Sequence, residues 1–187
     1  MSDKPSRLDR SFWDGKRVMV TGHTGFKGCW LTIWLEKLGC QIIGLSLKPL
    51  TDPALFDLAN ISARCDNHFV DIRDLKKVID VVKKTQPEVV FHLAAQALVY
   101  EGYSNPVETI ATNTMGTANI LEAIRLTASV RTAVMVTTDK VYHNNECLKP
   151  FKENDTIGGR DPYSASKAAS ELIIDCYRNA FFNAQGV

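Results

Sequence analysis

The chain has 187 residues, of which 45% are hydrophobic and 23% charged, and a formal net charge of +1 at pH 7. That length suits one globular domain with a sizeable core, and the balanced charge offers no field that would attract DNA or RNA. The first ten residues are polar and no apolar run is long enough to span a bilayer, so we expect neither a signal peptide nor a membrane segment.

Cysteine and histidine spacing predicts neither a disulfide framework nor a zinc site. The five cysteines are odd in number and share no C-x-x-C spacing, and the four histidines are scattered. We therefore expect reduced thiols, a cytoplasmic location and no bound metal. The cysteines are Cys29, Cys40, Cys65, Cys147 and Cys176.

Short β-branched or apolar runs alternate with helical patterns along the whole chain. The runs predict strands at residues 17–21, 41–47, 68–70, 89–92 and 132–137. Helices are predicted at 26–38, 54–59, 75–86, 106–126 and 162–182. This alternation is typical of a doubly wound parallel sheet of the Rossmann-like kind, and we expect residues 1–187 to form one dinucleotide-binding domain.

Two of the predicted helices carry apolar residues at helical spacing. The first has Phe26, Trp30, Ile33, Trp34 and Leu38, followed by Gly39 as a plausible C-terminal cap. The helix at 106–126 has five candidates for burial: Ile110, Met115, Ile120, Leu121 and Ile124. The last helix is expected to open with Asp161 as N-cap and Pro162 at the first helical position.

Residues 18–28, V-M-V-T-G-H-T-G-F-K-G, join the first predicted strand to the first long helix. Glycines spaced three apart let the backbone approach a ligand, and the helix behind them presents free N–H groups and its positive dipole end to a phosphate. The pattern predicts a dinucleotide site at Gly22, Gly25 and Gly28, although its spacing differs from G-x-G-x-x-G. His23 is expected to cap or pack in this turn.

Ligands of open parallel sheets bind beyond the carboxyl ends of the strands. There Asp71 is placed to accept a hydrogen bond from an adenine amino group; alternatively, Asp71 or Asp74 caps the following helix. Ala94 and Ala95 are small enough for a flat cofactor to lie against the backbone. No acidic residue follows the second strand to bind the ribose hydroxyls of the cofactor. Lys48 lies there instead, so the residues are compatible with NADP as well as with NAD.

Tyr163 and Lys167 lie four residues apart in the last predicted helix, and so on one face. An ammonium beside a phenol favours the phenolate, which makes a usable base. Together with the glycine turn upstream, the pair predicts nicotinamide-dependent chemistry. Asp139 and Lys140, at the end of the fifth strand, are read either as members of that site or as a turn residue and a solvated lysine.

Four motifs together resemble the extended short-chain dehydrogenase/reductases that act on nucleotide sugars. They are T-G-x-x-G-x-x-G from Thr21, H-L-A-A-Q from His92, N-T-M-G-T from Asn113 and Y-S-A-S-K from Tyr163. The resemblance extends from Phe12 to Phe182, and T-D-K at 138–140 resembles the 4,6-dehydratases of that family that act on CDP-glucose. Members of the family carry roughly as much chain again, including a substrate domain. The chain is therefore expected to be a fragment or truncated product lacking that C-terminal domain.

The resemblance implies NAD as cofactor, a nucleotide sugar (CDP-glucose) as substrate, a homo-oligomer, and catalytic roles for five residues. Tyr163 would take the proton of the sugar 4-hydroxyl, Thr138 would hydrogen-bond the same oxygen, and Lys167 would hold the nicotinamide ribose. Asp139 would protonate the departing 6-hydroxyl, and Lys140 would assist proton transfer at C5. The implied cofactor-binding residues are Gly22, Gly25, Phe26, Lys27, Gly28, Asp71, Ile72, Leu93, Ala94, Ala95, Asn113, Thr137, Tyr163 and Lys167.

Two other functions remain open at this point. Without a substrate domain, the chain could be a dinucleotide-binding module that catalyses nothing. A nucleotide-sugar epimerase or reductase would use Tyr163 and Lys167 in the same way but would not need Lys140.

Overall fold

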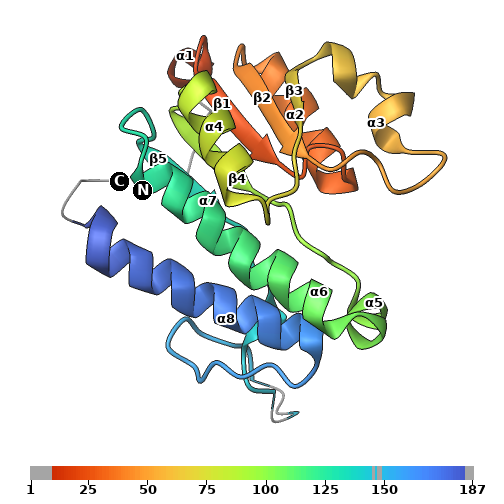
Figure 1. Cartoon of the computed structure of the whole chain (residues 1–187), viewed down its shortest axis with the longest axis vertical. Coiled ribbons are helices and arrows are strands. Elements are labelled where there is room, and N and C mark those ends of the chain that lie inside the picture. Colours follow the sequence, from red (N-terminus) through yellow and green to blue (C-terminus); the bar gives the residue numbers. More distant parts are fainter. Residues whose placement is uncertain (1–9, 145, 147–148, 184–187) are drawn as a thin grey trace, which may run out of the picture.

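Five parallel strands form one twisted sheet in the order β3-β2-β1-β4-β5 (Figure 1). The computed structural model describes residues 10–144, 146 and 149–183, which leaves Cys147 outside the described residues. The strands are β1 (Arg17–Thr21), β2 (Gln41–Ser46), β3 (Asp66–Phe69), β4 (Val89–His92) and β5 (Thr132–Met135). The strand order reverses direction beside β1, so the carboxyl ends of β1 and β4 border the crevice in which such sheets bind ligands.

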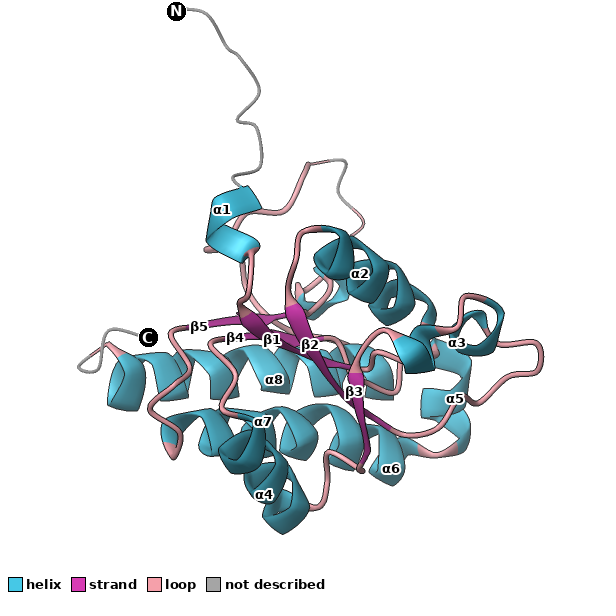
Figure 2. Cartoon of the chain, turned by 90° about the horizontal axis from the view of Figure 1, so that it is seen from above, coloured by secondary structure: helices cyan, strands magenta, loops and turns pink. Residues whose placement is uncertain are grey.

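Helices cover both faces of the sheet (Figure 2). On one side lie α2 (Phe26–Lys37) and α3 (Leu55–Leu58), and on the other lie α4 (Leu75–Thr85), α7 (Gly116–Arg125) and α8 (Pro162–Tyr177). The short pieces are α1 (Arg10–Trp13), η1 (Ile61–Ala63), α5 (Val99–Ser104), α6 (Pro106–Ile110), η2 (Ala111–Met115), η3 (Asp139–Val141) and η4 (Arg178–Phe182). This is the predicted doubly wound, Rossmann-like fold.

The central strand β1 is buried on both faces because helices cover both sides of it. Val18, Met19 and Val20 are each 0% exposed, although neighbouring residues of a strand point to opposite faces. Met19 belongs to the cluster shared with α4 and α7, whereas Val18 and Val20 pack with Leu35 of α2. The three residues thus anchor the start of the glycine turn in both layers of the core.

Of the apolar residues at helical spacing in and directly after α2, Leu38 is buried and Ile33 partly buried, but the three aromatic ones face outward. Phe26, Trp30 and Trp34 are 71%, 55% and 52% exposed. The helix instead buries Leu35 together with three small residues, which let it approach the sheet closely: Gly28, Cys29 and Thr32.

The predicted helix at 106–126 also differs, because a π-helical turn, η2, separates α6 from α7. The wide turn shifts the register of the buried face, so Ile110 and Met115 are 47% and 55% exposed, while Ile120, Leu121 and Ile124 are buried as predicted. The predicted cap of the last helix is confirmed: Asp161 accepts from the backbone N–H of Ser164, and Pro162 is the first helical residue.

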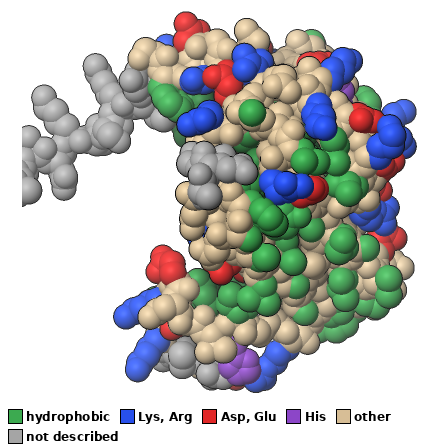
Figure 3. Space-filling model, turned by 60° about the vertical axis from the view of Figure 1, so that its left-hand side comes forward, with side chains coloured by type: hydrophobic (Ala, Val, Ile, Leu, Met, Phe, Trp, Pro, Cys, Tyr) green, Lys and Arg blue, Asp and Glu red, His purple; other side chains and the backbone are tan. Residues whose placement is uncertain are grey.

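The outer side of β5 carries exposed apolar side chains, including Val134 and Val136. Figure 3, in which the side of the molecule with β5 and the end of α8 is turned forward, shows a broad group of hydrophobic side chains. None of the helices in the described part of the chain has the length and apolar character needed to cross a bilayer.

Candidate dinucleotide and nucleotide-sugar site

The glycine turn connects β1 to α2, and its backbone packs too closely for side chains at two of its glycines. Gly22 has a φ of +75°, which favours glycine, and a Cβ atom there would lie 2.8 Å from the backbone nitrogen of Ala94. A Cβ atom at Gly28 would lie 2.1 Å from the carbonyl oxygen of Gly22. The N-cap of α2, Gly25, makes no side-chain hydrogen bond, so the first N–H groups of the helix are free of a cap. This cradle fits the phosphates of a dinucleotide.

Two side chains of the turn fasten it to the neighbouring strands. His23 is 0% exposed, and its Nε2 hydrogen-bonds Oδ1 of Asn67 at 3.0 Å, so it packs in the turn as expected. The hydroxyl of Thr24 donates to the carbonyl of Leu47 at 2.9 Å, just beyond β2. The turn is therefore held by both neighbouring strands, while Gly25 is exposed at its surface.

Beyond β3, the carboxylate of Asp71 is paired with Arg73. The guanidinium Nε donates to both carboxylate oxygens at 3.1 and 3.0 Å, and Nη2 donates at 2.6 Å. These hydrogen bonds hold the pKa of Asp71 below its ordinary value. Asp74, not Asp71, is the N-cap of α4, so the alternative role considered for these two residues falls to Asp74.

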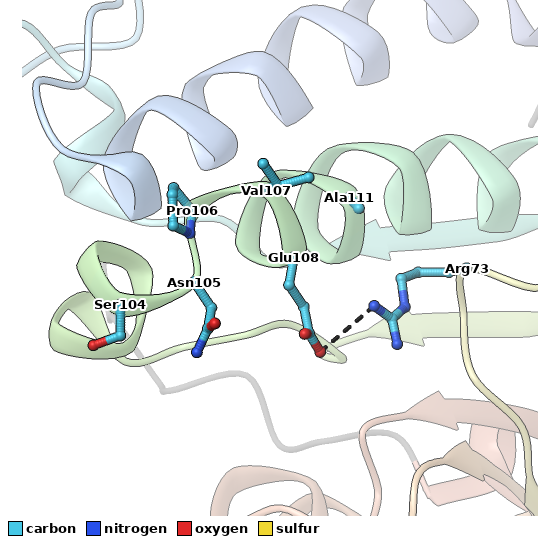
Figure 4. Close-up of a pocket in the computed structure, with 7 residues that line it drawn as sticks. All are labelled: Arg73, Ser104, Asn105, Pro106, Val107, Glu108 and Ala111. Atoms are coloured by element: carbon cyan, nitrogen blue, oxygen red, sulfur yellow. Dashed lines mark ion pairs between the residues drawn. The ribbon is translucent and has the colours of Figure 1, made fainter.

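Arg73 also forms an ion pair with Glu108 at 3.5 Å, and the two side chains face each other across an open groove of about 500 Å³ (Figure 4). The groove lies between the loop after β3 and the junction of α5 and α6. Ile72 is buried against α7, where the absence of a side chain at Gly116 makes room for it. These contacts fix the segment of Asp71 and Ile72, two residues that the resemblance implies for cofactor binding.

Beyond β4, the backbone of Leu93 and Ala94 is tied to the end of β1. Both N–H groups donate to the hydroxyl of Thr21 at 3.1 Å. Ala95 follows them and is partly exposed. Ala94 therefore borders the glycine turn at Gly22.

Asn113 lies in the π-helical turn η2 and is 1% exposed. Its side chain accepts from the N–H of Gln96 at 2.8 Å and donates to the hydroxyl of Ser166 at 2.9 Å. It thus joins the loop after β4 to α8 and does not face open solvent. π-Turns inside helices are frequent at functional sites.

Beyond β5, residues 137–140 place several polar side chains at the sheet edge. The hydroxyl of Thr138 accepts from the N–H of Lys140, which caps η3. Asp139 and Lys140 approach each other to 3.9 Å and have side chains that are 76% and 53% exposed. Thr137 donates a short hydrogen bond to the carboxylate of Glu171. The side chains of Asp139 and Lys140 are therefore accessible to a ligand at the carboxyl edge of the sheet.

Lys167 is 5% exposed, and its ammonium donates to the carbonyl of Val136 at 2.8 Å. Burial lowers the pKa of Lys167, and the negative charge of Glu171 opposes that shift. Tyr163 is half-buried in the first turn of the same helix. Because α8 also packs against η3, Tyr163 and Lys167 share one end of the sheet with Thr138, Asp139 and Lys140.

The predicted residues thus lie along the carboxyl edge of the sheet, from Asp71 beside β3 to Lys140 beyond β5. Sequence reasoning missed the groups that position them: Thr21, Thr24, His92, Thr117 and Glu171. Thr21, His92 and Thr117 lie within the quoted motifs without a role of their own, and Glu171 lies four residues after Lys167 on the same helix face.

A family model for GDP-mannose 4,6 dehydratase matches residues 19–183. The chain is 44% identical over 176 residues to CDP-glucose 4,6-dehydratase of Salmonella typhimurium, an alignment that covers 94% of this chain and 49% of the relative. It is 31% identical over 173 residues to dTDP-glucose 4,6-dehydratase of Xanthomonas campestris, covering 87% of this chain and 49% of that relative.

Among solved structures, UDP-glucose 4-epimerase from Brucella ovis in complex with NAD superposes with a TM-score of 0.75 and 24% sequence identity. The match covers 89% of this chain and 49% of the epimerase chain, and at that identity it shows the shared fold. The chain thus spans about half the length of the two dehydratase relatives.

Proposed function

Because the chain belongs to the GDP-mannose 4,6 dehydratase family, we propose that its protein is a nucleotide-sugar 4,6-dehydratase. The substrate we propose is CDP-glucose, and the product is CDP-4-dehydro-6-deoxyglucose. The observation that carries the proposal is the position of Thr138, Asp139 and Lys140 at the end of β5, next to the helix that holds Tyr163 and Lys167. The similarity to the CDP-glucose enzyme of Salmonella typhimurium supports the choice of sugar nucleotide.

The proposed cofactor is NAD, held along the carboxyl edge of β3, β1 and β4. Its phosphates would lie on the glycine turn, where Gly28 has no room for a side chain and Phe26 and Lys27 open α2. Asp71 and Ile72 would contact the adenine. The fold-level similarity to an epimerase solved with NAD supports this choice. When bound, NAD would accept hydride from C4 of the sugar and return it at C6, so that no net redox change occurs.

The nicotinamide end of the cofactor would lie beside α8 and the loops after β4 and β5. Lys167 would hold its ribose, since its ammonium already lies at the end of β5. Leu93, Ala94, Ala95 and Thr137 would line this end, and Asn113 would hold the loop after β4 in place through Gln96.

The residues of this chain would then move the protons of the reaction. Tyr163 would take the proton of the 4-hydroxyl, while the hydroxyl of Thr138 binds the same oxygen. A ketone at C4 acidifies the C5 hydrogen, so Lys140 would assist its removal while Asp139 protonates the departing 6-hydroxyl. The exposure of Asp139 and Lys140 leaves both groups open to a sugar.

An assay with CDP-glucose tests the proposal directly. We expect a 4-keto product, incorporation of solvent deuterium at C5, and NAD that is unchanged after turnover. Replacing Lys140 with Ala should abolish elimination, whereas Lys37→Ala, on the far side of the sheet in α2, should leave turnover unchanged. Turnover of UDP-glucose or dTDP-glucose in place of CDP-glucose would disprove the substrate assignment.

Two alternatives have distinct outcomes in the same assay. An epimerase would keep its activity in the Lys140→Ala variant, because epimerisation needs no acid pair at C5 and C6. A dinucleotide-binding module would bind NAD in a calorimetric titration and convert no nucleotide sugar.

We further propose a homo-oligomer in which α6, α7 and α8 pair between subunits. Val107 and Leu172, on α6 and α8, are 78% and 62% exposed, which is costly for a free surface. A cytoplasmic location is also proposed, because Cys29, Cys40, Cys65 and Cys176 are free thiols.

A further inference from the structure

His92 lies at the end of β4, directly between the glycine turn and the catalytic helix. It is 2% exposed, and in the sheet it pairs with Thr21, the residue before Gly22. Both ring nitrogens are hydrogen-bonded: Nδ1 to the hydroxyl of Thr21 at 2.7 Å and Nε2 to the hydroxyl of Thr117 at 3.3 Å. A buried imidazole satisfied on both sides is fixed in orientation.

The direction of each hydrogen bond follows from the other bonds of the two hydroxyls. Thr21 Oγ1 already accepts from the N–H groups of Leu93 and Ala94, so its own proton is donated to Nδ1. Thr117 Oγ1 donates to the carbonyl of Asn113 at 2.7 Å, so it accepts from Nε2. His92 is therefore neutral, with its proton on Nε2.

Burial and the nearby positive charge of Lys167 support this protonation state. Together they lower the pKa of His92 to about 3. A charged imidazole would have two donors and could not accept from Thr21. The ring therefore keeps one pattern of donors and acceptors at neutral pH.

At one end, these bonds fix the surface on which the dinucleotide would lie. The hydroxyl of Thr21 holds the backbone of Ala94 against Gly22, where a Cβ atom would come within 2.8 Å of the Ala94 nitrogen. A movement of the His92 ring would move the Thr21 hydroxyl. It would thereby change the spacing between the glycine turn and the loop after β4.

At the other end, the bonds reach the first turn of α8. Asn113, whose carbonyl accepts from Thr117, donates to the hydroxyl of Ser166, and Ser166 donates to the carbonyl of Tyr163 at 2.7 Å. The hydroxyl of Ser170 also donates to the carbonyl of Asn113. One continuous buried network therefore joins the glycine turn to Tyr163.

The geometry points to His92 as a positioning residue that couples occupation of the glycine turn to the placement of the first turn of α8, which carries Tyr163. We call the path Thr21–His92–Thr117–Asn113–Ser166 the His92 network. The inference takes its ligand, NAD(H), from the proposed function. The hydroxyl of Thr117 on α7 then contributes to dinucleotide affinity although it lies away from the glycine turn.

Thr117→Val tests the network without altering any residue assigned to the cofactor or to catalysis. We expect NADH affinity, measured by fluorescence titration of the folded protein, to fall about fivefold or more. Thr117→Ser, which restores the hydroxyl, should recover the affinity. Thr32→Val is the matched control, because Thr32 is 0% exposed and its hydroxyl has no hydrogen-bond partner among the described residues. The NADH affinity of this variant should equal that of wild type.

The nitrogen resonances of the His92 ring provide a second readout that is independent of turnover. In the ligand-free protein they should report a neutral ring protonated at Nε2, and they should shift when NADH is added. The Thr117→Val variant should lose that response.

Three results separate the hypotheses. Wild-type affinity in Thr117→Val, or a ring protonated at Nδ1, overturns the role of His92 alone. NADH binding with the expected dependence on Thr117, but no turnover of a nucleotide sugar, overturns the proposed function alone. A wild-type protein that binds no NADH overturns both.

Discussion

The ammonium of Lys167 donates a 2.8 Å hydrogen bond to the carbonyl of Val136, so a cation from α8 is buried at the end of β5. Burial lowers the pKa of this ammonium, which means that holding it charged costs folding free energy. A group of this kind is retained for a function and not for stability.

Replacing Lys167 with Met should therefore stabilise the fold while it weakens cofactor binding. We expect the free energy of unfolding to rise by about 1–3 kcal/mol, and NADH affinity to fall, because the ribose loses its proposed partner. Urea denaturation and fluorescence titration measure the two quantities. Lys140→Met is the control: its side chain is 53% exposed, so its stability should stay within about 0.5 kcal/mol of wild type. A less stable Lys167→Met variant would contradict the argument.

Acid should destabilise the protein through its two buried histidines. Burial lowers the pKa of His23 and that of His92, the latter to about 3, whereas both titrate near 6.5 in the unfolded chain. Below pH about 6.5 the unfolded chain therefore binds protons that the folded chain does not. As a result, the free energy of unfolding decreases as the pH is lowered. Each histidine contributes up to about 1.4 kcal/mol per pH unit.

Urea denaturation at several values between pH 5 and 7 measures this slope, in a range above the titration of the carboxylates. In His92→Gln the slope should decrease by the contribution of one proton. Thr117→Val keeps the histidine buried and should retain the wild-type slope. An unchanged slope in His92→Gln would show that His92 is protonated to the same extent in the folded and unfolded chain.

Gly44 of β2 makes room for the ring of His23, which lies directly above it. A Cβ atom at Gly44 would come within 2.4 Å of His23 Cδ2. Gly44→Ala should therefore displace the ring, break its hydrogen bond to Asn67 and lower the free energy of unfolding by about 1–3 kcal/mol. At Gly158 the nearest contact of an added Cβ is an ordinary 3.5 Å, so Gly158→Ala should be close to neutral. Thermal denaturation of the two variants gives the comparison.

The contact between Gly44 and His23 illustrates which features can be predicted from the sequence and which cannot. The strand at 89–92 and the cap of α8 follow from local residue types and are confirmed. The strand ends then place Asp71, Ala94 and Asp139 along one edge, because parallel strands end together. Nothing local says that Gly44 lies opposite His23, since that contact depends on how β2 aligns with the turn after β1.

Helix faces were the weaker part of the prediction. Apolar residues lie on both sides of α2, so spacing alone could not distinguish the aromatic face from the face that meets the sheet. The π-turn in residues 111–115 likewise has no pattern of residue types, although it shifts the burial of Ile110 and Met115. Polar networks such as that of His92 require the register of several elements at once.

Thr32 offers a stabilising substitution for a clear reason. Its hydroxyl is buried in α2 and has no hydrogen-bond partner in the part of the chain that the structure describes, which leaves the cost of removing it from water uncompensated. Val has nearly the same shape without that cost, so Thr32→Val should raise the free energy of unfolding by about 1 kcal/mol. Differential scanning calorimetry would register an increase in melting temperature. A decrease would indicate that the hydroxyl is hydrogen-bonded in solution.

The bidentate pairing of Arg73 with Asp71 holds the pKa of the carboxylate below its ordinary value and fixes its orientation. If Asp71 recognises adenine, its loss should matter only for ligands that contain adenosine. Asp71→Asn should weaken binding of NADH about tenfold, the value of a hydrogen bond to a charged group. It should leave binding of reduced nicotinamide mononucleotide, which has no adenosine, unchanged. Asp74→Asn is the matched control, since Asn caps a helix as well as Asp does, and Asp74 caps α4 and pairs only with the exposed Lys77 among the described residues. Equal losses for both ligands in Asp71→Asn would mean that the carboxylate supports the fold of the loop and does not read the adenine.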